Sequence, residues 1–159
     1  MNDIHVRIAE VKVGVSGDIL RTVLGSCVGI VFIWNELEIC GLAHCFLPEG
    51  DDLENPISAR YVNQAIESLI KLMKIKKKDI EQVEVYVAGG ANMINKLLKT
   101  SKSQVGEDNI KAAWKYLALH GFKIKKSNVG QGTGIKMIVD CSKRSVEFIR
   151  LENIDYNAL

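Results

Sequence analysis

Runs of hydrophobic residues along the chain predict a protein built mainly from strands. Two apolar runs rich in β-branched side chains lie at residues 27–34 and 39–46, and the polar segment 35–38 separates them. This arrangement is typical of a β-hairpin. Both faces of the predicted hairpin are apolar, so we expect other elements to cover it on both sides.

Further strands are expected before and after this hairpin. Residues 19–24 lead into the first arm as a short strand or an extended approach. Short apolar or alternating runs bounded by turn residues predict the other strands at residues 4–13, 84–87, 122–127, 135–141 and 145–151.

Two helices interrupt the strands. The pair Asn55-Pro56 is a typical helix start, with a capping residue followed by proline at the first helical position. The next residues place apolar side chains at intervals of three and four, which predicts one buried helix face: Tyr61, Val62, Ala65, Ile66, Leu69, Ile70 and Met73. A second helix is expected over residues 110–120, capped by Asn109, with Trp114 among its inward residues. Strands interrupted by two helices predict an α+β fold.

Size and charge fit an ordinary globular protein. The chain has 159 residues, of which 47% are hydrophobic and 25% charged, and its net charge is +2. We therefore expect one domain over residues 1–159. A nearly balanced charge does not indicate nucleic acid as a partner.

Neither membrane insertion nor export is expected. The sequence holds no apolar run of the length that a membrane-spanning helix needs, and its first residues are too polar for a signal peptide. We expect a cytoplasmic protein whose four cysteines, Cys27, Cys40, Cys45 and Cys141, stay reduced. Their spacing does not match a metal site, so we expect no metal.

The candidate chemistry lies on the hairpin. If its turn is centred between Asn35 and Glu36, then Cys27 lies directly opposite His44, and such pairs have Cβ atoms roughly 5 Å apart. A shift of one residue would instead place the two side chains on opposite faces. The thiolate form of cysteine is a nucleophile, and a neighbouring imidazole can take its proton. The alternative is that Cys27 is simply a small buried hydrophobic residue.

Glycine-rich segments add candidate oxygen-binding groups. Gly25 and Ser26 precede Cys27, so backbone N–H groups here could stabilise an oxyanion. Gly89 and Gly90 follow a predicted strand, and their N–H groups could also hold an oxygen, although such a pair is often plain turn chemistry. Asn92 could orient a substrate amide or cap the following helix.

Three segments resemble the signature sequences of the CheD family of chemoreceptor glutamine deamidases: LGSCVGI from Leu24, GLAHCFLP from Gly41 and AGGANM from Ala88. The resemblance implies that Cys27 is the nucleophile and His44 its partner, and that Thr22 positions His44. In some relatives the threonine lies one residue earlier, where this chain has Arg21. It also implies a layered β/β/α arrangement, with two packed mixed sheets and two main helices on one side.

The function implied by this resemblance is hydrolysis of glutamine to glutamate on methyl-accepting chemotaxis receptors through a thioester, without a cofactor. The expected substrate is the helical cytoplasmic domain of a receptor, and a CheC-like phosphatase is a further expected partner. Two alternatives stay open. The chain could be a regulatory binding module for such a phosphatase, or another thiol hydrolase such as a receptor methylesterase.

Overall fold

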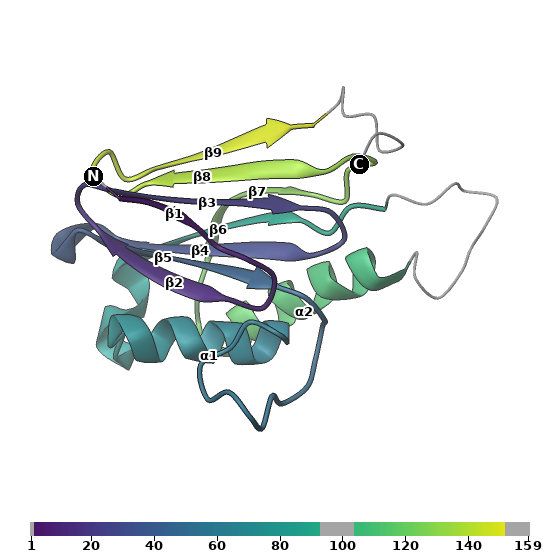
Figure 1. Ribbon diagram of the computed structural model, residues 1–159. Coiled ribbons are helices and arrows are strands. Elements are labelled where there is room, and N and C mark those ends of the chain that lie inside the picture. Colours follow the sequence, from purple (N-terminus) through teal and green to yellow (C-terminus); the bar gives the residue numbers. More distant parts are fainter. Residues whose placement is uncertain (1, 93–103, 152–159) are drawn as a thin grey trace.

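The computed structural model describes residues 2–92 and 104–151, which form two β-sheets and two α-helices in three layers (Figure 1). The outer sheet has four strands, in the order β1 (Asn2–His5), β3 (Asp18–Leu24), β8 (Ile135–Asp140) and β9 (Ser145–Arg150). The central sheet has five, in the order β2 (Val11–Val15), β5 (Ile39–Cys45), β4 (Val28–Trp34), β6 (Val83–Gly89) and β7 (Ile124–Val129). Each sheet contains one parallel pair, β1 with β3 and β6 with β7.

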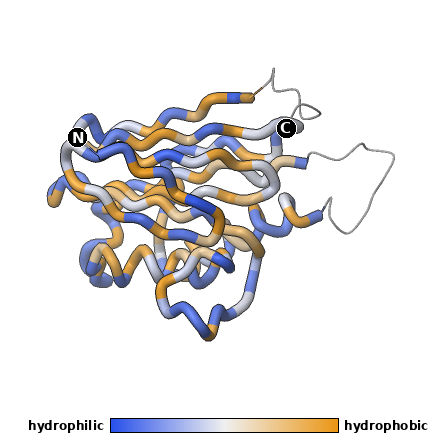
Figure 2. The backbone as a smooth tube through the Cα atoms, in the orientation of Figure 1, coloured by the Kyte–Doolittle hydropathy of each residue, from blue (hydrophilic) through white to orange (hydrophobic). Residues whose placement is uncertain are grey.

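Both helices, α1 (Val62–Met73) and α2 (Val105–Leu119), pack on the face of the central sheet that is turned away from the outer sheet (Figure 1). The arrangement confirms the predicted α+β fold with two mixed sheets and both helices on one side. Hydrophobic and hydrophilic residues alternate along the strands of the outer sheet (Figure 2), because one face of that sheet meets the solvent.

Alternation along the hairpin β4–β5 divides the core into two layers. Val28, Ile30 and Phe32 face the helices, together with Ala43 of β5. Cys27, Val31 and Leu42 face the outer sheet instead, where they pack on Leu20, Leu24 and Met137. The predicted coverage of both hairpin faces is therefore confirmed, and Cys27 lies on the side of the outer sheet.

The register of the hairpin differs from the expected one by two residues. A short 3-10 turn at Asn35–Leu37 and Glu38, in the left-handed conformation, connect the arms, so that Trp34 pairs with Ile39. As a result Gly29, and not Cys27, lies opposite His44. Because a shift of two preserves the alternation of a strand, Cys27 keeps the predicted face.

The expected single strand over residues 4–13 is wrong. Its two ends belong to different sheets, β1 and β2, and residues 6–10 cross between them alongside the end of β5. Ala9 and Glu10 form this contact: the N–H of Ala9 donates to the carbonyl of His44, and the N–H of His44 donates to the carbonyl of Glu10. Because β1 belongs to the outer sheet and β2 to the central sheet, residues 6–10 connect the two sheets beside His44.

The helix boundaries also differ from expectation. The first helix begins at Val62 and not after Asn55-Pro56, because residues 50–58 form a loop tied down by Asp52 and by the Gln64 side chain. The second begins at Val105, so Asn109 lies inside it and does not cap it. Trp114 is 39% exposed and is not one of the inward residues.

Two cysteines join the sheets, which corrects the expectation that all four stay reduced. Cys40 of β5 and Cys141, directly after β8, form a disulfide with a Cα–Cα distance of 5.9 Å. Both side chains face the layer between the sheets, where the disulfide joins residues that are 101 positions apart in the sequence. Cys27 and Cys45 are free thiols.

None of the helices in residues 2–92 and 104–151 has the length and hydrophobicity that a membrane span requires.

Candidate active site

Cys27 ends the turn that carries the chain from the outer sheet to the central sheet. Strand β3 finishes at Leu24 and β4 begins at Val28, so residues 25–27 form the connection; we call them the cysteine loop. Cys27 is buried, with 7% of its surface exposed. The N–H groups of Gly90 and Ala91 hold this loop by donating to the carbonyls of Cys27 and Gly25, over 2.8 and 2.9 Å.

A hydrogen-bond relay orients His44. The hydroxyl of Thr22 donates to the carbonyl of Val6 at 2.6 Å and lies 2.7 Å from Nδ1 of His44. A hydroxyl has one hydrogen and the carbonyl can only accept, so Nδ1 must carry a hydrogen and donate it to Thr22. The basic nitrogen of the neutral ring is therefore Nε2. It is buried and has no hydrogen-bond partner among the described residues.

Alternation along β3 explains why Thr22, and not its neighbour, reaches the histidine. Thr22 points inward and is 1% exposed. Arg21 points to the outer face of the sheet, where its guanidinium binds the carboxylate of Asp3 at 2.6 Å. The geometry therefore supports position 22 as the residue that holds His44.

Cys27 and His44 share one pocket of about 730 Å³. Its walls come from the cysteine loop, the ends of β1, β3 and β5, and residues 6–8 that cross between the sheets: His5, Val6, Arg7, Ile8, Val23, Gly25, Ser26, Cys27, His44 and Phe46. In the observed register the two side chains are diagonal neighbours, whose Cβ atoms typically lie within about 8 Å. The described contacts include no hydrogen bond between them, and such catalytic contacts often tighten only when substrate binds.

Of the predicted oxygen-binding residues, Gly25 and Ser26 line this pocket, whereas Gly89, Gly90 and Asn92 do not. Gly89 and Gly90 have positive φ angles of 98° and 63°, which favour glycine. The N–H of Gly90 is already used by the Cys27 carbonyl, so this group supports the loop and is not free to hold a substrate oxygen. Asn92 is exposed, and its backbone N–H donates to the carbonyl of Gln131. The helix that it was expected to cap would fall on residues 93–103, outside the described residues.

Asn109 is the residue whose place in the site the sequence did not predict. It is completely buried, and its side-chain amide donates to the carbonyls of Ser26 and Phe46, each at 3.1 Å. These carbonyls belong to the cysteine loop and to the residue after β5. The sequence carries two weak signals for this residue: it lies near the start of an amphipathic helix, which predicts a cap, and residues 105–109 (VGEDN) weakly resemble a CheD segment.

Burial keeps both members of the pair neutral. It raises the pKa of the Cys27 thiol to about 11, although the nearby backbone N–H of Cys27 acts in the opposite direction. It lowers the pKa of His44 to about 4. In the free protein the thiol therefore keeps its proton near neutral pH, and the imidazole is unprotonated.

The buried, neutral histidine should make stability depend on pH. Between pH 6.5 and about 4 the unfolded chain binds a proton at His44 and the folded protein does not. The free energy of unfolding should therefore fall as pH decreases through this window, by up to about 3 kcal/mol for this group. Urea unfolding of the wild-type protein and of His44→Gln between pH 4 and 7 measures this, and an equal slope for both proteins would contradict it.

Comparisons with known proteins identify the family of this chain. Residues 46–150 match the family model described as CheD chemotactic sensory transduction. The chain is 38% identical, over 84% of its length and 85% of the relative's, to the probable chemoreceptor glutamine deamidase CheD of Bdellovibrio bacteriovorus. It is 34% identical to the probable chemoreceptor glutamine deamidase CheD 2 of Ruegeria sp., over 89% of this chain and 88% of that protein. The chain belongs to the CheD family.

Proposed function

We propose that this protein deamidates glutamine side chains of chemoreceptors, with Cys27 as the nucleophile and His44 as the general base and acid. The observation that carries the proposal is the hydrogen bond between Thr22 and Nδ1 of His44, from which the tautomer of the ring follows. Thr22 holds the hydrogen on Nδ1, which leaves Nε2 as the basic atom beside the pocket that Cys27 also lines. The relatives named as chemoreceptor glutamine deamidases support the choice of substrate.

The first half of the reaction forms a thioester. Nε2 of His44 takes the proton of the Cys27 thiol, and the sulfur attacks the amide carbon of the glutamine. The carbonyl electrons move to oxygen, and backbone N–H groups at the cysteine loop stabilise the resulting oxyanion. When the intermediate collapses, the carbon–nitrogen bond breaks, and the His44 imidazolium gives its proton to the departing ammonia.

The second half hydrolyses the thioester. His44 takes a proton from water while the water oxygen attacks the thioester carbon. The second oxyanion collapses with cleavage of the carbon–sulfur bond, and the sulfur of Cys27 recovers its proton from His44. The product is glutamate, and the chain's own residues supply every proton transfer.

The pocket rim suits a protein substrate that presents an apolar surface. Ile8, Val23 and Phe46 line the pocket and are 56%, 50% and 42% exposed. An amphipathic helix could cover these side chains while one glutamine enters the pocket. This arrangement supports a receptor helix over a free small amide as the substrate.

Peptide mapping tests the proposal. A receptor cytoplasmic fragment incubated with the wild-type protein should gain the mass of an amide-to-acid change at specific glutamines and release one ammonia for each change. Loss of a methyl group from glutamyl esters, without deamidation, would instead identify a methylesterase. An unchanged receptor map would contradict both activities and favour a binding module.

Thr22→Val should lower kcat for deamidation by roughly 10- to 100-fold, because the Nδ1 hydrogen of His44 loses its acceptor and the ring loses its fixed tautomer. Thr22→Ser keeps the hydroxyl and should restore most of the activity. Arg21→Ala is the matched control, since it changes the adjacent residue on the opposite face of β3. Equal rates for Thr22→Val and Thr22→Ser would show that the hydroxyl does not act on His44.

A further inference from the structure

Three consecutive carbonyl groups of the cysteine loop accept hydrogen bonds from one side of the loop. The carbonyls of Gly25 and Cys27 accept from the N–H groups of Ala91 and Gly90. The carbonyl between them, that of Ser26, accepts from the side-chain amide of Asn109 at 3.1 Å. Two of the three donors are backbone groups, so Asn109 is the only side chain in the set.

Because the peptide bond is planar, the direction of the Ser26 carbonyl also fixes the direction of the Cys27 N–H. In a trans peptide the C=O of one residue and the N–H of the next point in opposite directions, and the described chain contains no cis peptide. Because the Ser26 carbonyl points toward α2, the N–H of Cys27 points away from α2. The pocket that Cys27 shares with residues 5–8 and His44 is lined by no residue of α2.

Helix α2 packs closely against residues 90 and 91, whose N–H groups hold the cysteine loop. A Cβ at Gly106 would lie 2.6 Å from the carbonyl oxygen of Ala91, and one at Gly90 would lie 2.4 Å from Cγ1 of Ile110. The second hydrogen of the Asn109 amide binds the carbonyl of Phe46, two residues after His44. Both acceptors are carbonyl oxygens, so the amide must present its NH2 group to them.

We propose that Asn109 is a positioning residue that locks the Ser26–Cys27 peptide so that the Cys27 N–H becomes the oxyanion donor of the active site. The same amide ties this donor to the chain segment that follows His44. The oxyanion role rests on the proposed thiol chemistry, whereas the orientation of the peptide does not depend on the identity of the substrate.

Two reagents that modify the same sulfur separate an oxyanion effect from general damage. p-Nitrophenyl acetate acylates Cys27 through a tetrahedral oxyanion, which then expels p-nitrophenolate. Iodoacetamide alkylates it by displacement of iodide at a saturated carbon, and no oxyanion forms. Asn109→Ala should therefore lower the acylation rate by about 100-fold while the alkylation rate and its pH profile stay unchanged. Each rate is measured by mass spectrometry of the Cys27 peptide, with Cys27→Ala as the background.

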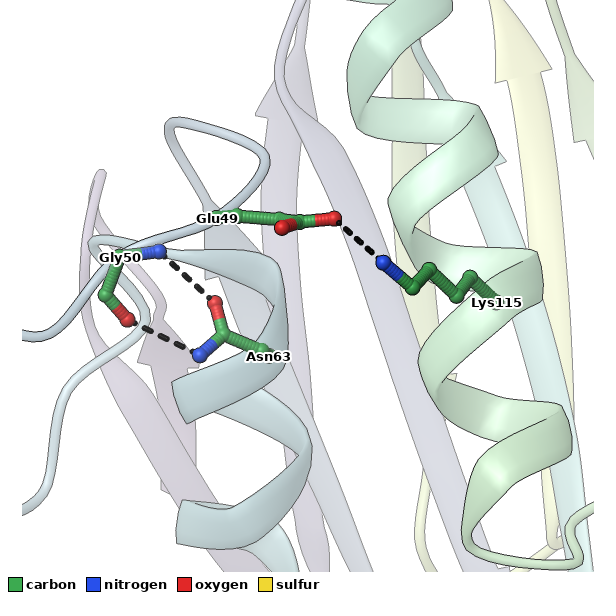
Figure 3. Close-up of polar contacts among 4 residues, drawn as sticks. All are labelled: Glu49, Gly50, Asn63 and Lys115. Carbon is green, nitrogen blue, oxygen red and sulfur yellow. Dashed lines mark hydrogen bonds and ion pairs between the residues drawn. The ribbon is translucent and has the colours of Figure 1, made fainter.

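Asn63→Ala is the matched control. Asn63 also lies on a helix, and its side chain also makes two hydrogen bonds to backbone groups, accepting from the N–H of Gly50 and donating to its carbonyl (Figure 3). These bonds hold the loop after β5, close to the Glu49–Lys115 ion pair (Figure 3). Both pair Asn63 with Gly50, and neither involves the cysteine loop. Asn63→Ala should leave both modification rates unchanged.

Asn109→Ser and Asn109→Asp give the same comparison if the alanine variant does not fold, and circular dichroism identifies the folded variants. The proposal is overturned if the folded variants lose acylation and alkylation in equal proportion, or if they lose neither. With a receptor fragment, Asn109 variants should lower kcat and leave KM nearly unchanged. If the wild-type protein fails to deamidate the fragment but the Asn109 variants still lose acylation selectively, the proposed substrate is refuted and the role of Asn109 stands.

Discussion

Cys27→Ala should lower the rate of receptor glutamine deamidation by at least about 10⁴-fold, because no other group in the pocket can form the thioester. His44→Ala should cause a similar loss. The double variant should be no slower than either single variant, since the nucleophile and its base act as a unit. Ammonia release and peptide mapping of the same receptor fragment measure all three rates.

Cys45→Ala is the control for the thiol itself. Cys45 is also a free, buried cysteine, but its side chain packs in the layer between the central sheet and the helices. Its removal should lower stability and leave turnover in place. Deamidation by Cys27→Ala at the wild-type rate would end the proposed mechanism.

Gly89→Ala should have the second largest effect, on both stability and kcat. Gly89 has a φ of +98°, and a Cβ at this position would lie 2.3 Å from the carbonyl oxygen of Cys27. The cysteine loop must move to relieve this contact. Since a displacement of about 1 Å at a reacting group can cost about 100-fold in rate, we expect a kcat loss of that order.

Gly17→Ala separates the effect of the steric contact with Cys27 from the effect of backbone strain. Gly17 has nearly the same φ, +101°, but a Cβ there would meet nothing within 4 Å. Both substitutions carry the cost of a left-handed alanine, roughly 1–2 kcal/mol. Only Gly89→Ala should lower kcat, and its free energy of unfolding should fall further. Equal effects of the two substitutions on urea unfolding and kcat would show that Gly89 does not support Cys27.

Much of the fold could be predicted because it depends on local patterns. The alternation of the hairpin placed Cys27 and His44 on one face, and the structure has them there, on the side of the outer sheet. The spacing of Val62, Ala65, Ile66 and Leu69 predicted the buried face of α1. Hydrophobic periodicity predicts these faces correctly because it depends on which side chains are buried, and not on which element covers them.

Predictions that required a partner or an exact boundary were less accurate. The hairpin register was wrong by two residues, since the connection adopts a 3-10 turn and a left-handed Glu38 that the polar segment did not specify. Asparagine is a residue type typical of helix caps, yet the Asn109 amide donates hydrogen bonds to two carbonyls that are 83 and 63 residues away in sequence. The Cys40–Cys141 disulfide was missed for the same reason.

The sequence by itself determined the nature of the groups and the faces they occupy: a thiol and an imidazole on one side of a hairpin covered on both faces. The tertiary structure decided how those groups are held. Thr22 reaches His44 only because β3 packs across β5, and the cysteine loop is oriented only because α2 and residues 89–91 lie behind it. Side-chain identity and alternation are local properties of the chain, whereas hydrogen bonds between distant segments exist only after the layers have packed.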